Sequence, residues 1–196
     1  MSDALLPPLL KELIPNGIEY NTSLLIEFDP YSIWFETSLT IAVQAMKAGI
    51  RTHYHTFQHP PDDIRKTFYR FGLDVKKLED DDMLWMGDSY TVQTGISSPK
   101  DLSDGTQTSV KISDWSIAVA KDVLKPLQKG EIPESWKRRL HIDENTGILL
   151  QYNQEKEVVD FWCTRVIPYK TESVLLFSFV RGRGVRAVLQ TIRIPM

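Results

Sequence analysis

The chain has 196 residues, of which 42% are hydrophobic, and a formal net charge of −3, which excludes a globally basic nucleic-acid-binding surface. Its one cysteine, Cys163, cannot form an internal disulfide. No apolar run approaches the roughly 20 residues of a membrane span, and no basic flank precedes the short apolar stretch at the amino terminus. We therefore expect a single cytoplasmic domain over residues 1–196 that makes no membrane contact.

Short apolar runs bounded by turn residues alternate along the chain with segments in which apolar residues recur at helical spacing. The first half comprises a strand at 23–29, a helix at 35–47, a strand at 51–57, a helix that opens at 60–63 and ends at Gly72, and a strand at 83–86. Residues 91–110 are rich in Ser, Thr, Gly and Asp and lack periodicity, which predicts an exposed loop.

The second half continues the alternation. It comprises a helix at 113–127, a strand at 139–143, a helix at 154–167 and two strands at 173–180 and 185–194. Because helices separate most of the strands, we expect an α/β fold with a mainly parallel sheet and helices on both faces. The last two strands lie too close together for a helical crossover and therefore predict a C-terminal antiparallel hairpin.

The first predicted strand leads into Phe28-Asp29-Pro30-Tyr31-Ser32-Ile33-Trp34-Phe35-Glu36, which opens the first long helix. In order and spacing this segment resembles the Gly-Asp-Pro-Gly-Ser-Gly-Lys-Thr-Thr phosphate-binding loop (P-loop) of KaiC-like ATPases, a branch of the RecA superfamily. The strand at 139–143 resembles the Walker B strand of that family, with Asp143 as the acid on the magnesium side. The resemblance implies a RecA-like, three-layer α/β/α fold and an oligomer.

The positions that carry P-loop chemistry in that family hold other residue types here. Phe28, Tyr31 and Ile33 stand at glycine positions, and their side chains hinder the approach of backbone N–H groups to phosphate. Trp34 stands at the position of the phosphate-binding lysine, and Phe35 at that of the magnesium-binding hydroxyl. The loop therefore lacks the groups that bind a nucleotide in the family.

Two further positions depart from the family pattern. Glu36 adds a carboxylate beside the place of an anionic ligand, and Gln58-His59 stands where the family has a pair of catalytic glutamates. A neutral glutamine cannot act as the general base that activates water. We therefore predict a pseudo-ATPase that has lost its activity and has no cofactor. It would act as an oligomeric scaffold or regulator, either with itself or with a RecA-like relative.

The aromatic and aliphatic side chains of Tyr31, Ile33, Trp34 and Phe35 gather where a nucleotide would sit in the family. We expect these side chains to fill the vacated site. The alternative is that they form a docking site for a partner protein, because Trp and Tyr are enriched at such sites.

Two other functions stay open. Arg181, Arg183 and Arg186 form a basic loop between the last two predicted strands, which favours weak, salt-dependent nucleic-acid contact in a recombinase-paralogue accessory. Asp29 and Asp143 could instead belong to an atypical nucleotide site.

Three other features carry weaker signals. His53 and His55 share one face of a predicted strand, but neither a cysteine nor a second closely spaced ligand pair accompanies them, so we predict no metal site. Asp80-Asp81-Asp82 predicts a solvated turn. Cys163, next to a tryptophan in a helical pattern, predicts a buried apolar residue.

Overall fold

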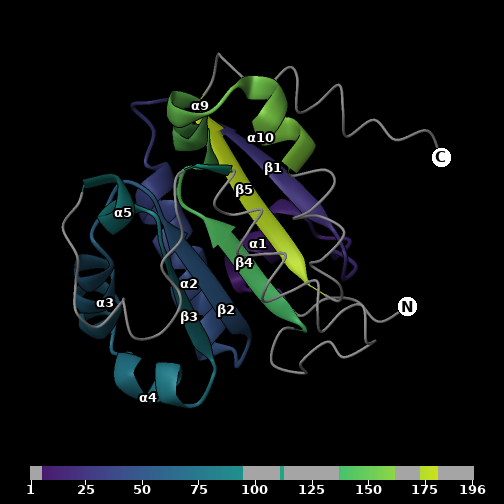
Figure 1. Cartoon of the computed structure of the whole chain (residues 1–196). Helices are drawn as coiled ribbons and strands as arrows, with labels where there is room; N and C mark the ends of the chain where they lie inside the picture. Colours follow the sequence, from purple (N-terminus) through teal and green to yellow (C-terminus); the bar gives the residue numbers. More distant parts are fainter. Residues whose placement is uncertain (1–5, 95–110, 113–136, 162–172, 181–196) are drawn as a thin grey trace, which may run out of the picture.

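The computed structural model describes residues 6–94, 111–112, 137–161 and 173–180. Its centre is a parallel sheet of five strands in the order β1-β5-β4-β2-β3 (Figure 1). The strands are β1 (Ser23–Phe28), β2 (Arg51–Thr56), β3 (Leu84–Asp88), β4 (Arg139–Asp143) and β5 (Val174–Val180). The expectation of a mainly parallel sheet is confirmed.

Helices connect these strands. Those of the first half are α1 (Pro8–Leu13), α2 (Trp34–Lys47), α3 (Pro61–Arg70), α4 (Val75–Asp80) and α5 (Tyr90–Thr94). Those of the second half are the 3-10 turn η3 (Thr146–Ile148), α9 (Leu149–Tyr152) and α10 (Glu155–Phe161). After α2, Gly49 takes a φ of 74°, which glycine adopts at little cost and which ends the helix.

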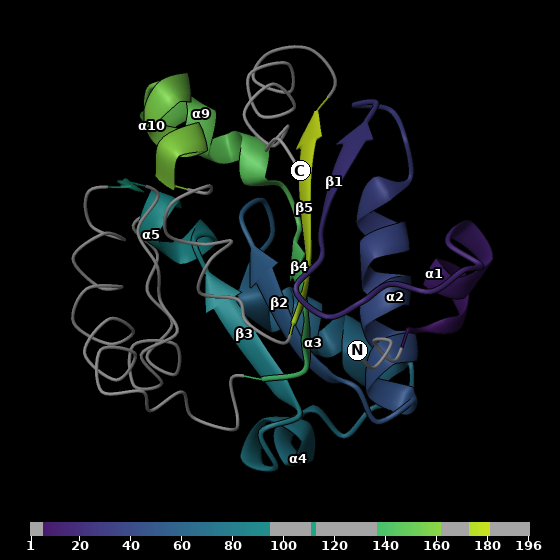
Figure 2. The ribbon, with the colours of Figure 1, turned by 90° about the vertical axis from the view of Figure 1, so that its right-hand side faces the viewer.

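Two apolar cores lie on the two faces of the sheet. Helices α1, α2 and α3 pack in one core, and α9 and α10 pack in the other, so that α1 and α2 lie across the sheet from α9 and α10 (Figure 2). Strand β5 serves both cores by alternation: Val174 and Leu176 belong to the first, and Leu175, Phe177 and Phe179 to the second. The described part of the chain is therefore a three-layer α/β arrangement.

The predicted elements agree with the structure at four strands and shift by one or two residues at the third, β3. The expected loop at 91–110 is wrong at its start, because α5 begins at Tyr90 and the Asp88 carboxylate accepts the Thr91 N–H at 2.8 Å. Helix α4 was not expected; its six residues are too few to show a period. The helix at 113–127, the end of the helix at 154–167 and the strand at 185–194 lie outside the described residues, so the antiparallel hairpin stays a prediction.

The sheet topology indicates where a ligand site would lie. Strands β2 and β4 are neighbours, yet the helix after β2 packs in the first core and the helices after β4 pack in the second. In open parallel sheets, such a pair leaves a crevice at the carboxyl ends of the strands, and ligands bind there. Within the described residues, no helix has the length and apolar character needed to cross a bilayer.

Candidate functional site at the carboxyl edge of the sheet

The crevice between the carboxyl ends of β2 and β4 holds the carboxylate of Glu144, whose side chain is 1% exposed. Its Oε2 atom accepts the N–H groups of Phe57 at 2.8 Å and Gln58 at 2.9 Å, and the Thr56 hydroxyl at 3.0 Å. Successive N–H groups that point at one place form a nest for an anion. Here the anion is part of the protein itself.

His59 completes this arrangement. Its Nδ1 atom forms a hydrogen bond with the second Glu144 oxygen. This bond raises the pKa of the imidazole above its ordinary value of 6.5, although partial burial acts in the opposite direction. The negative charges of Glu144, Glu36 and Asp63 raise the pKa further. The Phe35 ring stacks on the imidazole with 3.8 Å between ring centroids. Phe35 and His59 thus pack the start of α2 against the loop that follows β2.

We expect the contribution of His59 to stability to depend on pH. Because the folded-state pKa is raised, the stabilisation is fully present below about pH 6.5 and is lost as the pH rises through the raised pKa. The melting temperature of His59→Gln should therefore fall further below that of the wild type at about pH 5.5 than at about pH 9. Equal differences at both pH values would contradict a charged His59–Glu144 pair.

Trp34, at the start of α2, is buried with 9% of its surface exposed. Its indole Nε1 donates a hydrogen bond of 3.0 Å to the main-chain carbonyl of Glu144, and its ring lies 6.1 Å from that of Phe28. The Ser178 hydroxyl on β5 donates to the same carbonyl at 2.7 Å. The tryptophan therefore ties the start of α2 to the residue that follows β4.

The rest of the 29–36 segment faces solvent. Tyr31 is 97% exposed and Ile33 is 72% exposed, and the carboxylates of Asp29 and Glu36 are exposed as well. Asp29 shapes the turn, because its Oδ1 atom accepts the Tyr31 N–H at 2.9 Å. We expected all four apolar side chains of this segment to fill the site. Trp34 and Phe35 point inward as expected, whereas Tyr31 and Ile33 are exposed and do not fill it.

Asp143 is the last residue of β4 and contacts other side chains than Glu144, which directly follows the strand. Its carboxylate accepts the Thr146 hydroxyl at 3.3 Å and lies 3.6 Å from His55 Nδ1. His55 Nε2 in turn lies 3.0 Å from Ser89 Oγ. Ser89, His55 and Asp143 are thus arranged like the nucleophile, base and acid of a catalytic triad. Ser89 is completely buried, however, so its hydroxyl is out of reach of a substrate.

A second histidine contact lies two residues earlier on β2 and β4, on the face of the sheet that carries His55. His53 and His141 are register partners on β2 and β4, and their Nδ1 atoms are 3.0 Å apart. Gly87 on β3 leaves room for the rings, because a Cβ there would lie 2.9 Å from both His53 and His55. Across the ranges that the structure describes, no three His, Cys, Asp or Glu side chains are grouped to hold a metal ion.

The expectation of a solvated turn at residues 80–82 holds only for Asp81, because Asp80 ends α4 and the turn residue Asp82 is only partly exposed. Its carboxylate accepts a hydrogen bond of 2.6 Å from Arg139 Nη2 and another from the Trp85 indole. Arg139 opens the central strand β4, its side chain is completely buried, and its guanidinium lies 3.9 Å from the centre of the Trp85 ring. A buried guanidinium requires a partner, which is why this acid turns inward.

The structure thus brings Trp34 and Phe35 together with two residues whose roles sequence reasoning did not anticipate, His59 and Glu144. Glu144 carried a weak signal, since it directly follows Asp143 at the end of a predicted strand. Three predicted contacts, Arg181, Arg183 and Arg186, lie outside the described residues, as does Cys163.

No protein-family model matches the chain. No curated protein matches it either. Among solved structures, the chain is similar to an uncharacterised protein from Pyrococcus horikoshii that was crystallised in complex with an unknown peptide. The TM-score is 0.61 at 14% sequence identity, over 94% of this chain and 78% of the other. This likeness is one of fold and agrees with the α/β class.

Proposed function

We propose that this protein is a non-catalytic, RecA-like protein of the KaiC-like kind that acts through protein–protein contacts, as a scaffold or regulator. One observation carries the proposal. The N–H donors at the end of β2 bind the buried carboxylate of Glu144, in the crevice where this kind of sheet would take a ligand.

A nucleotide phosphate would meet two further obstacles. It would have to displace Glu144 from the Phe57 and Gln58 N–H groups, which deprives a buried carboxylate of its main-chain hydrogen bonds. It would also approach the start of α2, where Trp34 fills the space and Glu36 already places negative charge in the first turn. Each feature opposes an anionic ligand for a separate physical reason.

The exposed side chains support a contact with protein. Tyr31 and Ile33 expose large apolar surface beside a rigidly anchored Trp34, and such residues commonly anchor interfaces. The Pyrococcus horikoshii protein of similar fold was crystallised with a peptide. This supports a polypeptide partner in preference to a nucleotide.

We expect millimolar Mg-ATP to leave the melting temperature unchanged within about 1 °C, compared with magnesium chloride at equal ionic strength. A ligand at about 100 times its dissociation constant adds roughly 2.7 kcal/mol, which raises the melting temperature of a chain of this size by about 5–10 °C. A rise of that size would overturn the proposal and would indicate an atypical nucleotide site around Asp29 and Asp143.

A further inference from the structure

We infer that His59 is a pH-controlled latch: its protonated imidazole holds the start of α2 closed against Glu144, and loss of the proton lets residues 29–36 open. The latch is built from three places in the fold. They are Trp34 and Phe35 at the start of α2, His59 in the loop after β2, and Glu144, which follows β4. The inference goes beyond the proposed function, because it concerns how this segment moves and not what it binds.

Glu144 anchors the start of α2 in two ways. Its main-chain carbonyl accepts the indole N–H of Trp34 at 3.0 Å. Its carboxylate acts through His59, since Oε1 is bonded to His59 Nδ1 and the imidazole stacks on Phe35 with 3.8 Å between ring centroids and 14° between the ring planes. The other carboxylate oxygen is fixed by two main-chain N–H groups. His59, whose side chain is 39% exposed, therefore links a fixed anion to the helix.

The proton of His59 strengthens both of its contacts. A hydrogen bond between an imidazolium and a carboxylate is charge-assisted and is roughly twice as strong as a neutral one. A cation within about 6 Å of an aromatic ring centre is attracted by that ring, which adds to the stack on Phe35. A neutral imidazole keeps the Nδ1–H bond in one tautomer but loses both contributions of the charge.

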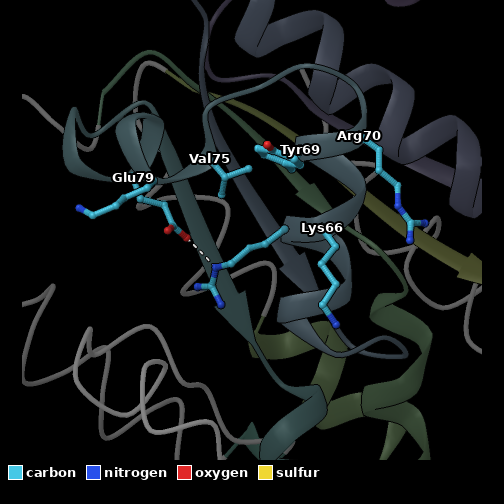
Figure 3. A pocket seen from close by; sticks show the side chains of 7 residues that line it. Lys66, Tyr69, Arg70, Val75 and Glu79 are labelled. Atoms are coloured by element: carbon cyan, nitrogen blue, oxygen red, sulfur yellow. Dashed lines mark hydrogen bonds and ion pairs between the residues drawn. The ribbon is translucent and has the colours of Figure 1, made fainter.

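The charged groups that face the imidazole come from three elements. Its bond to Glu144 is the main cause of its raised pKa, burial opposes that shift, and the charges of Glu144, Glu36 and Asp63 add to it. Glu36 lies in the first turn of α2 and Asp63 in the first turn of α3, where it pairs with Lys66 at 2.8 Å. Figure 3 shows Lys66 and Arg70 extending from α3 at the hollow between α3 and α4. The three acids favour the protonated, closed latch.

Opening of the latch becomes easier as the pH rises. The closed state raises the pKa of the imidazole, whereas an imidazole released to water returns to its ordinary value of 6.5. Below about pH 6.5 both states are protonated, so the ratio of open to closed molecules is constant. This ratio then rises, by at most about tenfold per pH unit because one proton is involved, and levels off above the raised pKa. A partner that binds the closed segment would bind less tightly at alkaline pH, a consequence that rests on the proposed function.

Hydrogen exchange of the whole chain, followed by NMR, tests the latch. Two probes report on the segment. They are the indole N–H of Trp34, bonded to the Glu144 carbonyl, and the amide of Thr37, which donates to the Ile33 carbonyl at 2.9 Å. Protection factors correct for the intrinsic pH dependence of exchange. We expect those of both probes to fall between about pH 6 and about pH 9, and a change smaller than about twofold would overturn the latch.

The amides of Ala42 and Ala45, buried in the same helix, separate local opening from global unfolding. A local opening exposes little surface, so the two probes should be less protected than these amides, and their protection should depend little on low urea concentrations. The protection of Ala42 and Ala45 should instead fall with urea, as global stability does. Equal protection and equal urea dependence at all four positions would overturn the latch, because the segment would then open only with the whole chain.

Substitutions identify the proton. His59→Gln cannot be protonated, so the protection of the probes should be low at every pH. Glu36→Gln removes an exposed charge that raises the pKa of His59 and keeps every contact of the latch, so the curve should keep its form and move to lower pH. Asp29→Asn is the matched control. It removes another exposed carboxylate of the segment, keeps an oxygen to accept the Tyr31 N–H, and should leave the curve in place.

The failures of the two proposals are distinguishable. A pH dependence that persists in His59→Gln, or a curve that Glu36→Gln does not move, would overturn the latch and leave the non-catalytic function standing. A rise of the melting temperature with Mg-ATP would overturn the function and leave the latch untouched.

Discussion

Replacement of Glu144 by alanine is expected to lower the free energy of unfolding by about 2–5 kcal/mol. The substitution deprives the Phe57 and Gln58 N–H groups of their acceptor, and a buried donor left without a partner costs about 1–3 kcal/mol. The measurement is urea unfolding at neutral pH, with the slope of the transition compared between variants to verify that the denatured state is unchanged.

The matched control for this prediction is Glu144→Gln, which keeps the volume and one carbonyl oxygen as an acceptor. We expect its loss to be smaller, about 1–2 kcal/mol, because the charge is removed but the donors keep a partner. The alanine variant should also be stabilised more by sulfate than the wild type, since the vacated N–H groups form an anion nest. An alanine variant as stable as the wild type would show that the hydrogen bonds of Glu144 to these N–H groups do not stabilise the fold.

Replacement of Trp34 by alanine is expected to lower the free energy of unfolding by about 3–5 kcal/mol, as for other buried large aromatics. Trp34→Phe separates the two contributions of the side chain, because it keeps most of the packing and removes the indole donor to the Glu144 carbonyl. Since Ser178 also donates to that carbonyl, we expect the phenylalanine variant to lose only about 1 kcal/mol.

Tyr31→Ala provides the opposite pattern in the same segment. Its side chain is 97% exposed, so its removal should change the free energy of unfolding by no more than about 0.5 kcal/mol. Self-association measured by light scattering should nevertheless weaken in Tyr31→Ala. A contrary result would be a Trp34→Ala variant that keeps its stability but no longer assembles. Trp34 would then be a docking residue, and it would be wrong to treat Trp34 as the buried anchor and Tyr31 as the contact residue.

These predictions describe a sheet whose usual ligand crevice is filled from within. The Trp34 indole binds the Glu144 carbonyl, the Phe35 ring stacks on His59, and the Glu144 carboxylate accepts an N–H group at the end of β2. The contact of Trp34 also fixes the 29–36 segment in place, because Trp34 is buried while Tyr31 and Ile33 remain outside. One short segment thus both fills the crevice and exposes apolar surface.

The amino-acid sequence by itself determined the five strands that the structure describes, helices α2 and α3, and the parallel arrangement. Apolar runs such as residues 23–28 and the spacing along α2 are local patterns, and each lies within a window of about a dozen residues. The sequence alone also shows that Trp34 and Phe35 are not the lysine and hydroxyl residues that bind phosphate and magnesium in a P-loop. Short helices such as α4 were missed, since six residues make less than two turns.

Only the tertiary structure decided the contents of the site. The donor at Gln58 and its acceptor Glu144 are separated by 86 positions, and His53 and His141 by 88. No local pattern encodes such pairs, because they depend on the strand order that places β4 beside β2. The different roles of Asp143 and Glu144 also depend on the end of β4: Asp143 ends the strand and lies near His55, whereas Glu144 follows the strand and accepts the N–H donors.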